Sequence, residues 1–192
     1  MIRSLSFSLS LSSLCLLIFL CGCGNDPKGQ KLIEADGPKI EDLEELQELA
    51  TQSKEGVSLR SSLFKSSKGD YLIGYQLKTA EPGFYIYSLS HDSIKADGIG
   101  VATSIAIVPN GVVTSTGGFA ESSESVVETN ETLGIEYSIY PDGNVTIYQP
   151  VTLSAQKGEF EVQFSWQACM KSGICKSPVI NFIVPHNLNL TE

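Results

Sequence analysis

Short apolar runs separated by turn residues fill most of the chain, and this pattern predicts strands. The alternation is clearest over residues 160–166, where aromatic and aliphatic residues take every second position and polar residues lie between them. Clusters of Gly, Pro, Asn and Asp, such as the one at 141–144, separate the runs. The predicted strands are Val57–Phe64, Tyr71–Thr79, Phe84–Ser90, Ile105–Val108, Ile135–Tyr140, Val145–Leu153, Glu159–Gln167 and Val179–Val184.

Strands of this length and spacing are typical of an antiparallel β-sandwich with an immunoglobulin-like topology. We therefore predict an all-β fold, with a single domain over residues 56–192. The stretch 111–132 is rich in Ser, Thr, Gly and Glu and has few apolar residues to bury. Because such a segment gains little from packing, we predict a long loop there.

An acidic segment precedes the strands. Its apolar residues recur about every three positions between Pro38 and Gly56, and this spacing predicts an amphipathic helix over residues 38–52. We interpret residues 23–55 as an acidic tether containing this short helix. The helix either packs one apolar stripe on the domain or docks a partner.

The first 22 residues have the features of an export signal. Arg3 precedes an apolar run from Leu5 to Leu20, which is short for a membrane span. Leu20-Cys21-Gly22-Cys23 resembles a bacterial lipobox, in which Gly22 precedes an acylated Cys23. We predict a lipoprotein signal peptide over residues 1–22 and a lipid-anchored chain on the extracytoplasmic, periplasmic side of a membrane. An ordinary secretory signal is the alternative, and it too leads to a compartment where disulfides persist.

Charge and composition count against several functions. The formal net charge of −9 opposes binding to nucleic acid and to anionic lipid by charge. The two histidines, His91 and His186, form no metal motif, and no phosphate-binding glycine motif is present. We therefore predict neither a metal nor a cofactor. Soft sulfur ligands at Cys169, Met170 and Cys175 leave Cu(I) binding as a distant alternative.

Cys169 and Cys175 are the cysteines that we expect in the folded, mature domain. Cys169 ends an apolar strand, and a five-residue loop containing Gly173 leads to Cys175. Cysteines across such a hairpin can approach the Cα separation of roughly 5.5–6 Å that a disulfide prefers. Closing so short a loop removes only roughly 2.4 kcal/mol of chain entropy, and a local pair beside a loop is accessible to another thiol. We interpret the pair as redox-active, with a structural hairpin staple as the alternative.

The order Gln167-Ala168-Cys169, five residues, Cys175 and Pro178 resembles the signature of a known family. This family is the N-terminal periplasmic domain of the thiol:disulfide interchange protein DsbD, also described as a disulfide bond corrector domain. The similarity extends roughly from Val57 to Val184 and implies the same immunoglobulin-like sandwich. Its further landmarks are the strand at Pro82–Tyr87, the run Gly134–Tyr140 and the pair Pro150-Val151.

The resemblance implies a redox role for the pair. In the family, the reduced cysteines pass two electrons to oxidised extracytoplasmic proteins, and a thioredoxin-like or membrane-embedded reductant restores them. Cys175 is then the cysteine that forms the mixed disulfide, and Cys169 resolves it. Family members continue into a multi-helix membrane segment and a thioredoxin-like domain, neither of which is recognisable within the 192 residues. The resemblance therefore implies either a separate reductant or loss of the activity.

The resemblance also implies a surround for the active site. Tyr85 and Tyr87 match family tyrosines that lie beside the cysteines, although two alternating aromatics are equally consistent with core packing. A cap loop covers the family's cysteine pair, and its matching positions here include Glu131 and Leu133. The aromatic residue of that cap is absent, so Leu133 or Phe119 would have to provide the shield. A non-catalytic binding lipoprotein with a structural disulfide is the second hypothesis, and the reduction potential discriminates between the two.

Overall fold

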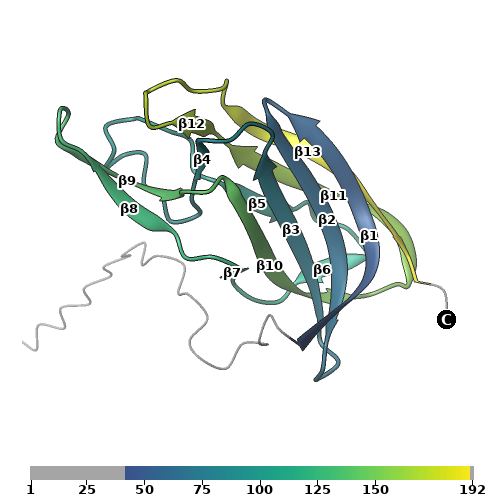
Figure 1. Cartoon of the computed structure of the whole chain (residues 1–192). Helices are drawn as coiled ribbons and strands as arrows, with labels where there is room; N and C mark the ends of the chain where they lie inside the picture. Colours follow the sequence, from purple (N-terminus) through teal and green to yellow (C-terminus); the bar gives the residue numbers. More distant parts are fainter. Residues whose placement is uncertain (1–41, 191–192) are drawn as a thin grey trace, which may run out of the picture.

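The structure is a computed structural model that describes residues 42–190 (Figure 1). The predicted signal peptide, Cys23 and the first part of the tether lie outside the described residues. Within residues 42–190, no helix is long and apolar enough to cross a membrane. The strands are β1 (Leu43–Lys54), β2 (Val57–Ser66), β3 (Tyr71–Thr79), β4 (Phe84–Tyr87), β5 (Ser104–Ile107), β6 (Val113–Ser115), β7 (Ala120–Glu121), β8 (Val126–Asn130), β9 (Ile135–Tyr140), β10 (Asn144–Leu153), β11 (Lys157–Trp166), β12 (Ala168–Met170) and β13 (Val179–Asn189).

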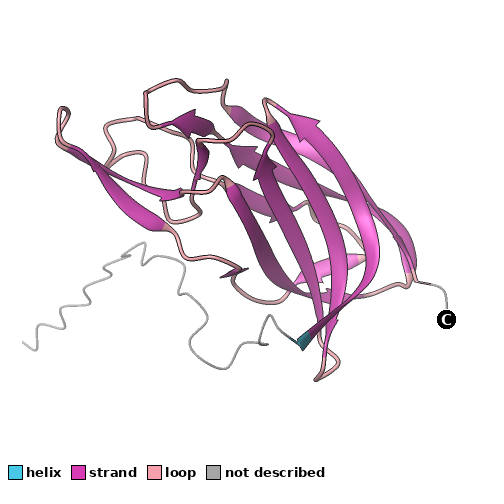
Figure 2. Ribbon diagram, viewed as in Figure 1, coloured by secondary structure: helices cyan, strands magenta, loops and turns pink. Residues whose placement is uncertain are grey.

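The strands form three antiparallel sheets (Figure 2). The largest has the order β1-β2-β3-β10-β6, with β7 also paired to β10; the second is β13-β11-β5, and the third is β12-β4-β9-β8. The first two sheets share one hydrophobic core, in which the rings of Tyr75 on β3 and Phe164 on β11 meet edge-to-face at 5.5 Å. The predicted all-β, immunoglobulin-like antiparallel sandwich is confirmed.

Strand β11, which has the clearest alternation of apolar and polar residues, supplies the centre of this core. Phe160, Val162, Phe164 and Trp166 are all at most 3% exposed, whereas Glu161 between them faces solvent. Such burial of large apolar side chains is the main favourable term in the stability of a sandwich. All eight predicted strands are present. The main differences are that β4 ends at Tyr87 and that β13 extends to Asn189.

The helix predicted over residues 38–52 is wrong in its described part, because Leu43–Lys54 form strand β1. β1 pairs with β2, so the sheet begins at Leu43 rather than at residue 56. The pairing has two irregularities, one between Glu45 and Gln47 and one between Glu48 and Ala50. Each adds one residue to the strand, and the added residues are Leu46 and Leu49. The two β-bulges therefore change a strand's two-residue spacing into the three-residue spacing that resembles a helix.

The long loop predicted over residues 111–132 is also corrected, because this stretch contains β6, β7 and β8. All three lie at the margins of sheets, where β6 and β7 pair with β10 and β8 pairs with β9. Edge strands are held by backbone hydrogen bonds on one side and need few apolar side chains. The polar composition of the stretch therefore did not reveal them.

Candidate functional site

The Cys169–Cys175 disulfide joins the two arms of a tight hairpin that begins with β12. Lys176 N–H donates to the Ala168 carbonyl at 2.9 Å, and Met170 N–H donates to the Ile174 carbonyl at 2.7 Å. These bonds flank the cysteines, which therefore face each other at a non-hydrogen-bonded position, where side chains are closest. Their Cα atoms are 4.0 Å apart. Gly173, with φ of +89°, closes the turn by donating its N–H to the Met170 carbonyl.

The two sulfur-bearing residues differ sharply in exposure. Cys169 is 1% exposed, whereas Cys175 is exposed on the outer arm of the hairpin. This difference follows from position, because β12 pairs with β4 in the third sheet, whereas at Cys175 the backbone forms only an isolated bridge to Cys169. The expectation that Cys169 is the more buried of the two is confirmed. An incoming thiol can therefore reach only the Cys175 side of the disulfide.

Aromatic side chains pack around the buried cysteine. Cys169 pairs with Tyr85 across β12 and β4, which lie side by side in Figure 1. Cys169, Tyr85, Tyr87 and Ile139 form a small hydrophobic cluster separate from the main core, with Tyr137 packed against it. The hydroxyls of Tyr85 and Tyr87 are 3.4 Å apart. The structure thus brings both predicted tyrosines to the cysteine pair.

Two tyrosines near the buried cysteine, Tyr85 and Tyr137, have pKa values above that of an ordinary tyrosine. Burial is the main cause that raises the pKa of Tyr85, and the hydrogen bond with Tyr87 adds to the effect. The pKa of Tyr137 is raised by burial and then by the negative charge of Glu128, whose carboxylate accepts a 3.5 Å hydrogen bond from the Tyr137 hydroxyl. Neutral phenols leave the surroundings of Cys169 weakly polar.

Each lysine that flanks the cysteines is paired with a carboxylate. Lys171 Nζ lies 2.6 Å from Glu128 Oε1, and this contact raises the pKa of Lys171. Lys176 Nζ lies 2.7 Å from Glu81 Oε1. The ion pairs reduce the field of both ammonium groups at the hairpin. Activation of Cys175 by an unpaired neighbouring cation is therefore not supported by the geometry.

The residues expected in a cap loop lie at the turn between β8 and β9. Glu131 is exposed and Leu133 is 58% exposed, in a turn where Asn130 Oδ1 accepts hydrogen bonds from Thr132 N–H and Leu133 N–H. Among the described contacts, none joins this turn to Cys169 or Cys175. Phe119, the other candidate shield, packs against the main core instead.

Sequence reasoning missed several residues of the cluster. Tyr137 and Ile139 alternate along β9 as Tyr85 and Tyr87 do along β4, and that alternation was the available signal. The His91 ring packs against the Tyr87 ring at a tilt of 36°, with ring centroids 4.5 Å apart, and His91 Nε2 lies 2.9 Å from the Ile99 carbonyl oxygen. No local sequence pattern predicts this position of His91, because His91 reaches the Tyr87 ring only when the loop after β4 folds back over that strand.

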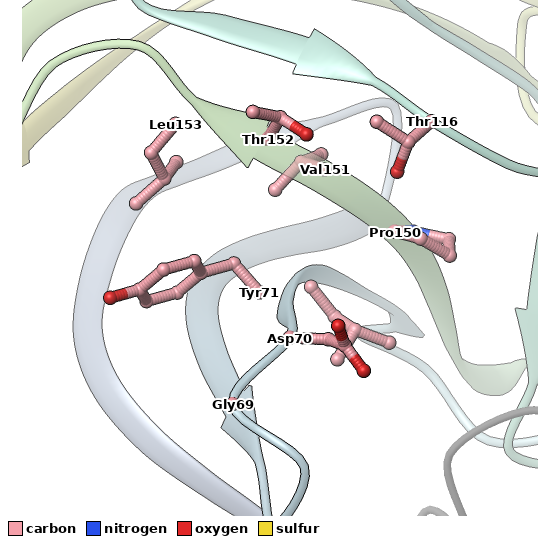
Figure 3. A pocket seen from close by; sticks show the side chains of 9 residues that line it. Gly69, Asp70, Tyr71, Thr116, Pro150, Val151, Thr152 and Leu153 are labelled. Carbon is pink, nitrogen blue, oxygen red and sulfur yellow. The ribbon is translucent and has the colours of Figure 1, made fainter.

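Two other kinds of site are less well supported. A depression of about 400 Å³ lies beside Tyr71 and Pro150, at the end of β3 remote from the disulfide (Figure 3). Asp70 is the only carboxylate in its lining, which contains no Cys, Ser, Lys or His side chain. Within residues 42–190, no group of three His, Cys, Asp or Glu side chains is placed to hold a metal ion.

Comparisons with known proteins add similar solved structures. No family model and no curated protein matches the chain. The N-terminal domain of Neisseria meningitidis DsbD in the reduced form is 15% identical, with a TM-score of 0.35 over 61% of this chain and 82% of that one. The N-terminal periplasmic domain of ScsB from Proteus mirabilis is 16% identical, with a TM-score of 0.47 over 76% of this chain and 51% of that one.

A third similar structure is the complex between the DsbD and PilB N-terminal domains of Neisseria meningitidis, at 14% identity and a TM-score of 0.36. It covers 80% of this chain and 88% of the matched one. At such low identity and TM-score, roles are not transferred residue by residue. The assignment of function therefore depends on the geometry of the hairpin and its surroundings.

Proposed function

We propose that this chain is an extracytoplasmic thiol–disulfide exchange module. Its Cys169–Cys175 pair passes electrons between a thioredoxin-like or membrane-embedded reductant and oxidised partner proteins. The observation on which the proposal depends is that one disulfide joins a buried and an exposed cysteine. A pair used only as a staple needs no such asymmetry, whereas an exchange site needs one accessible sulfur and one protected sulfur.

The exchange proceeds in two thiolate attacks. A thiolate of the reductant attacks Cys175 Sγ, a mixed disulfide forms, and Cys169 leaves as a thiolate that takes up a proton. The second thiol of the reductant then attacks the reductant's sulfur atom in the mixed disulfide. This attack releases Cys175 as a thiolate, which also takes up a proton. The reductant is thereby oxidised to a disulfide and this chain gains two electrons and two protons. Delivery to an oxidised partner runs the same steps in reverse, with Cys175 attacking the partner and Cys169 resolving the mixed disulfide.

The fold limits which sulfur can react. The chain leaves β11 at Trp166 and enters β12 at Ala168, so Cys169 follows directly after the strand at the centre of the core. Its side chain then packs on Tyr85 and cannot be approached from solvent without opening the cluster. Cys175 lies beyond the turn, next to Ile174, which is 61% exposed. A partner can therefore contact Cys175 while Cys169 stays covered until the mixed disulfide forms.

The proposal is tested by the redox behaviour of the mature chain. We expect a reduction potential well above about −300 mV and rapid two-electron exchange with a reduced thioredoxin, followed through the fluorescence of Trp166. A potential below that value, together with no exchange, would instead support the binding lipoprotein with a structural disulfide. A Cys169→Ala/Cys175→Ala variant is the control for fluorescence changes unrelated to the disulfide.

We also propose that Cys23 carries a lipid that holds the module at a membrane, on the basis of Leu20-Cys21-Gly22-Cys23. Cys23→Ala should then move the protein from the membrane fraction to the soluble fraction and abolish labelling with a fatty acid. Cys21→Ala is the matched control and should change neither result. Unchanged retention and labelling of Cys23→Ala would exclude the anchor without affecting the exchange chemistry.

A further inference from the structure

Lys176, the residue directly after the exposed cysteine, has an unusually well-held side chain. Its Nζ lies 2.7 Å from Glu81 Oε1 and 4.9 Å from the centre of the Phe84 ring. Its stem crosses Gly56, where an added Cβ would lie 3.2 Å from Lys176 Cε. The side chain is 31% exposed, compared with 68% for Lys171 on the same hairpin. The stem and the charge of Lys176 are therefore both held by neighbours.

The backbone of Lys176 is held as well. Its N–H donates to the Ala168 carbonyl at 2.9 Å, and its carbonyl accepts a hydrogen bond from Gln167 Nε2 at 3.2 Å. Both partners belong to the arm that carries Cys169. The residue next to Cys175 is thus attached to the opposite arm by its main chain and to the rest of the domain by its side chain.

The groups that receive the Lys176 side chain belong to the sandwich. Gly56 is in the turn between β1 and β2, Glu81 is in the connection from β3 to β4, and Phe84 begins β4. Ala80 N–H donates to the Gly56 carbonyl at 2.8 Å and joins the first two of these segments. Lys176 therefore connects the Cys175 arm to segments outside the hairpin.

We propose that Lys176 is a positioning residue that holds Cys175 opposite Cys169 after the disulfide has been reduced. This inference deepens the proposed exchange function and rests on it. With the S–S bond open, the effective concentration of one thiol at the other depends on how firmly the Cys175 arm is held. A firmly held arm favours the disulfide and lowers the reduction potential. Loss of the Lys176 contacts should therefore make the pair a stronger oxidant.

The test is the equilibrium of the mature chain with glutathione, in which the protein disulfide and two glutathiones give the protein dithiol and glutathione disulfide. For Lys176→Ala we expect the equilibrium constant to shift about tenfold toward the dithiol, which corresponds to about 30 mV for a two-electron couple. Lys176→Met, which retains the stem over Gly56, should give a smaller shift in the same direction. Glu81→Gln removes the ion pair but keeps the ammonium group over the Phe84 ring, so its shift should be no larger than that of Lys176→Met.

Coupling and control variants distinguish positioning from a general loss of stability. The shift in Lys176→Met/Glu81→Gln should be less than the sum of the two single shifts, because both remove the same contact. Lys171→Met removes the other ion pair of the hairpin and should change the equilibrium constant less than about twofold. The Lys171 side chain is 68% exposed, whereas that of Lys176 is 31% exposed and also packs on Gly56 and Phe84. The thermal midpoint of each oxidised variant shows whether the fold has changed.

Several outcomes would overturn the assignment. An equal shift in Lys171→Met would show a nonspecific effect, and no shift in a folded Lys176→Ala would show that the contacts are irrelevant to the pair. A shift toward the disulfide would mean that the Lys176 charge stabilises the Cys175 thiolate instead. The glutathione equilibrium requires no protein partner, so it tests the positioning role separately from the proposed function. If Lys176→Ala shifts the glutathione equilibrium constant but the chain does not exchange with thioredoxin, the proposed function is rejected and the positioning role of Lys176 stands.

Discussion

Cys169 lies directly opposite Tyr85 in the pairing of β12 with β4, and this contact buries one sulfur of the disulfide while the other faces solvent. The two sulfur atoms of the disulfide therefore differ in their access to solvent. In the proposed exchange, Cys175 is the sulfur open to attack from solvent, and the leaving sulfur of Cys169 lies in the cluster with Tyr85, Tyr87 and Ile139.

The first prediction concerns which cysteine forms mixed disulfides. Cys169→Ala leaves an exposed thiol at Cys175 and should trap thioredoxin-like partners, detected by non-reducing electrophoresis and identified by mass spectrometry. Cys175→Ala leaves a thiol beneath the tyrosine cluster and should trap little, because thiolate attack requires access. Equal trapping by the two variants would contradict the assigned roles. The double variant controls for association that does not involve sulfur.

The second prediction compares the disulfide with the core. Because the closed loop is short, Cys169→Ser/Cys175→Ser should lower the free energy of unfolding by no more than roughly 2–3 kcal/mol and leave the sandwich folded. Phe164→Ala should cost more, about 3–5 kcal/mol, because Phe164 is fully buried at the centre of the core. Denaturant melts measure both values. Unfolding caused by loss of the disulfide alone would favour the structural staple.

The third prediction is an acid-sensitive stability that originates at His186. Its ring is 1% exposed and stacks on Phe160 at 5.1 Å, and burial lowers its pKa from 6.5 to about 4. Between these two values the unfolded chain binds a proton that the folded chain excludes, so stability falls as the pH drops from about 6.5 to about 4 and this contribution then levels off. The loss should be on the order of 3 kcal/mol.

His186→Leu isolates this contribution, because leucine has a similar volume and cannot titrate. Denaturant melts across that pH range should show a smaller slope for the variant than for the unmodified chain. The slope of stability against pH that remains in the variant measures the contribution of the carboxylates of the domain. An unchanged slope would show that His186 is not the group responsible.

The fourth prediction concerns the loop that packs on Tyr87. Gly98 and Gly100 have nearly equal φ angles, +80° and +82°, but a Cβ at Gly100 would lie 2.4 Å from Tyr87 Cζ, whereas a Cβ at Gly98 would meet no atom within 4 Å. Gly98→Ala should cost about 1–2 kcal/mol from backbone strain alone. Gly100→Ala should cost roughly 1–3 kcal/mol more because it also displaces the Tyr87 ring.

Unfolding free energies from denaturant melts give this difference directly, since the two glycines lie in the same loop and have nearly equal positive φ angles. Similar costs for the two variants would show that the loop moves away from Tyr87 without penalty. A larger cost at Gly100, together with greater reactivity of Cys169 toward a small alkylating agent after reduction, would show that the loop covers the buried sulfur through Tyr87.

The sequence by itself determined most of the sandwich and the centre of the candidate site. Period-two alternation identifies strands such as β11 because it directly reflects which side chains face the core. The spacing of Cys169 and Cys175 around a glycine-containing turn likewise predicted a hairpin disulfide, because so few residues can close only a local loop. The greater burial of Cys169 followed from its place at the end of an apolar strand.

Only the tertiary structure decided the features that depend on pairing between distant segments. β1 resembled a helix because its two bulges alter the spacing of Leu46 and Leu49, and a bulge exists only in relation to a partner strand. β8 was hidden because an edge strand needs few apolar side chains. The partners of the hairpin lysines lie 43 residues away at Glu128 and 95 residues away at Glu81. Local periodicity records which face of a segment is buried, whereas register and long-range ion pairs are fixed only when the sheets assemble.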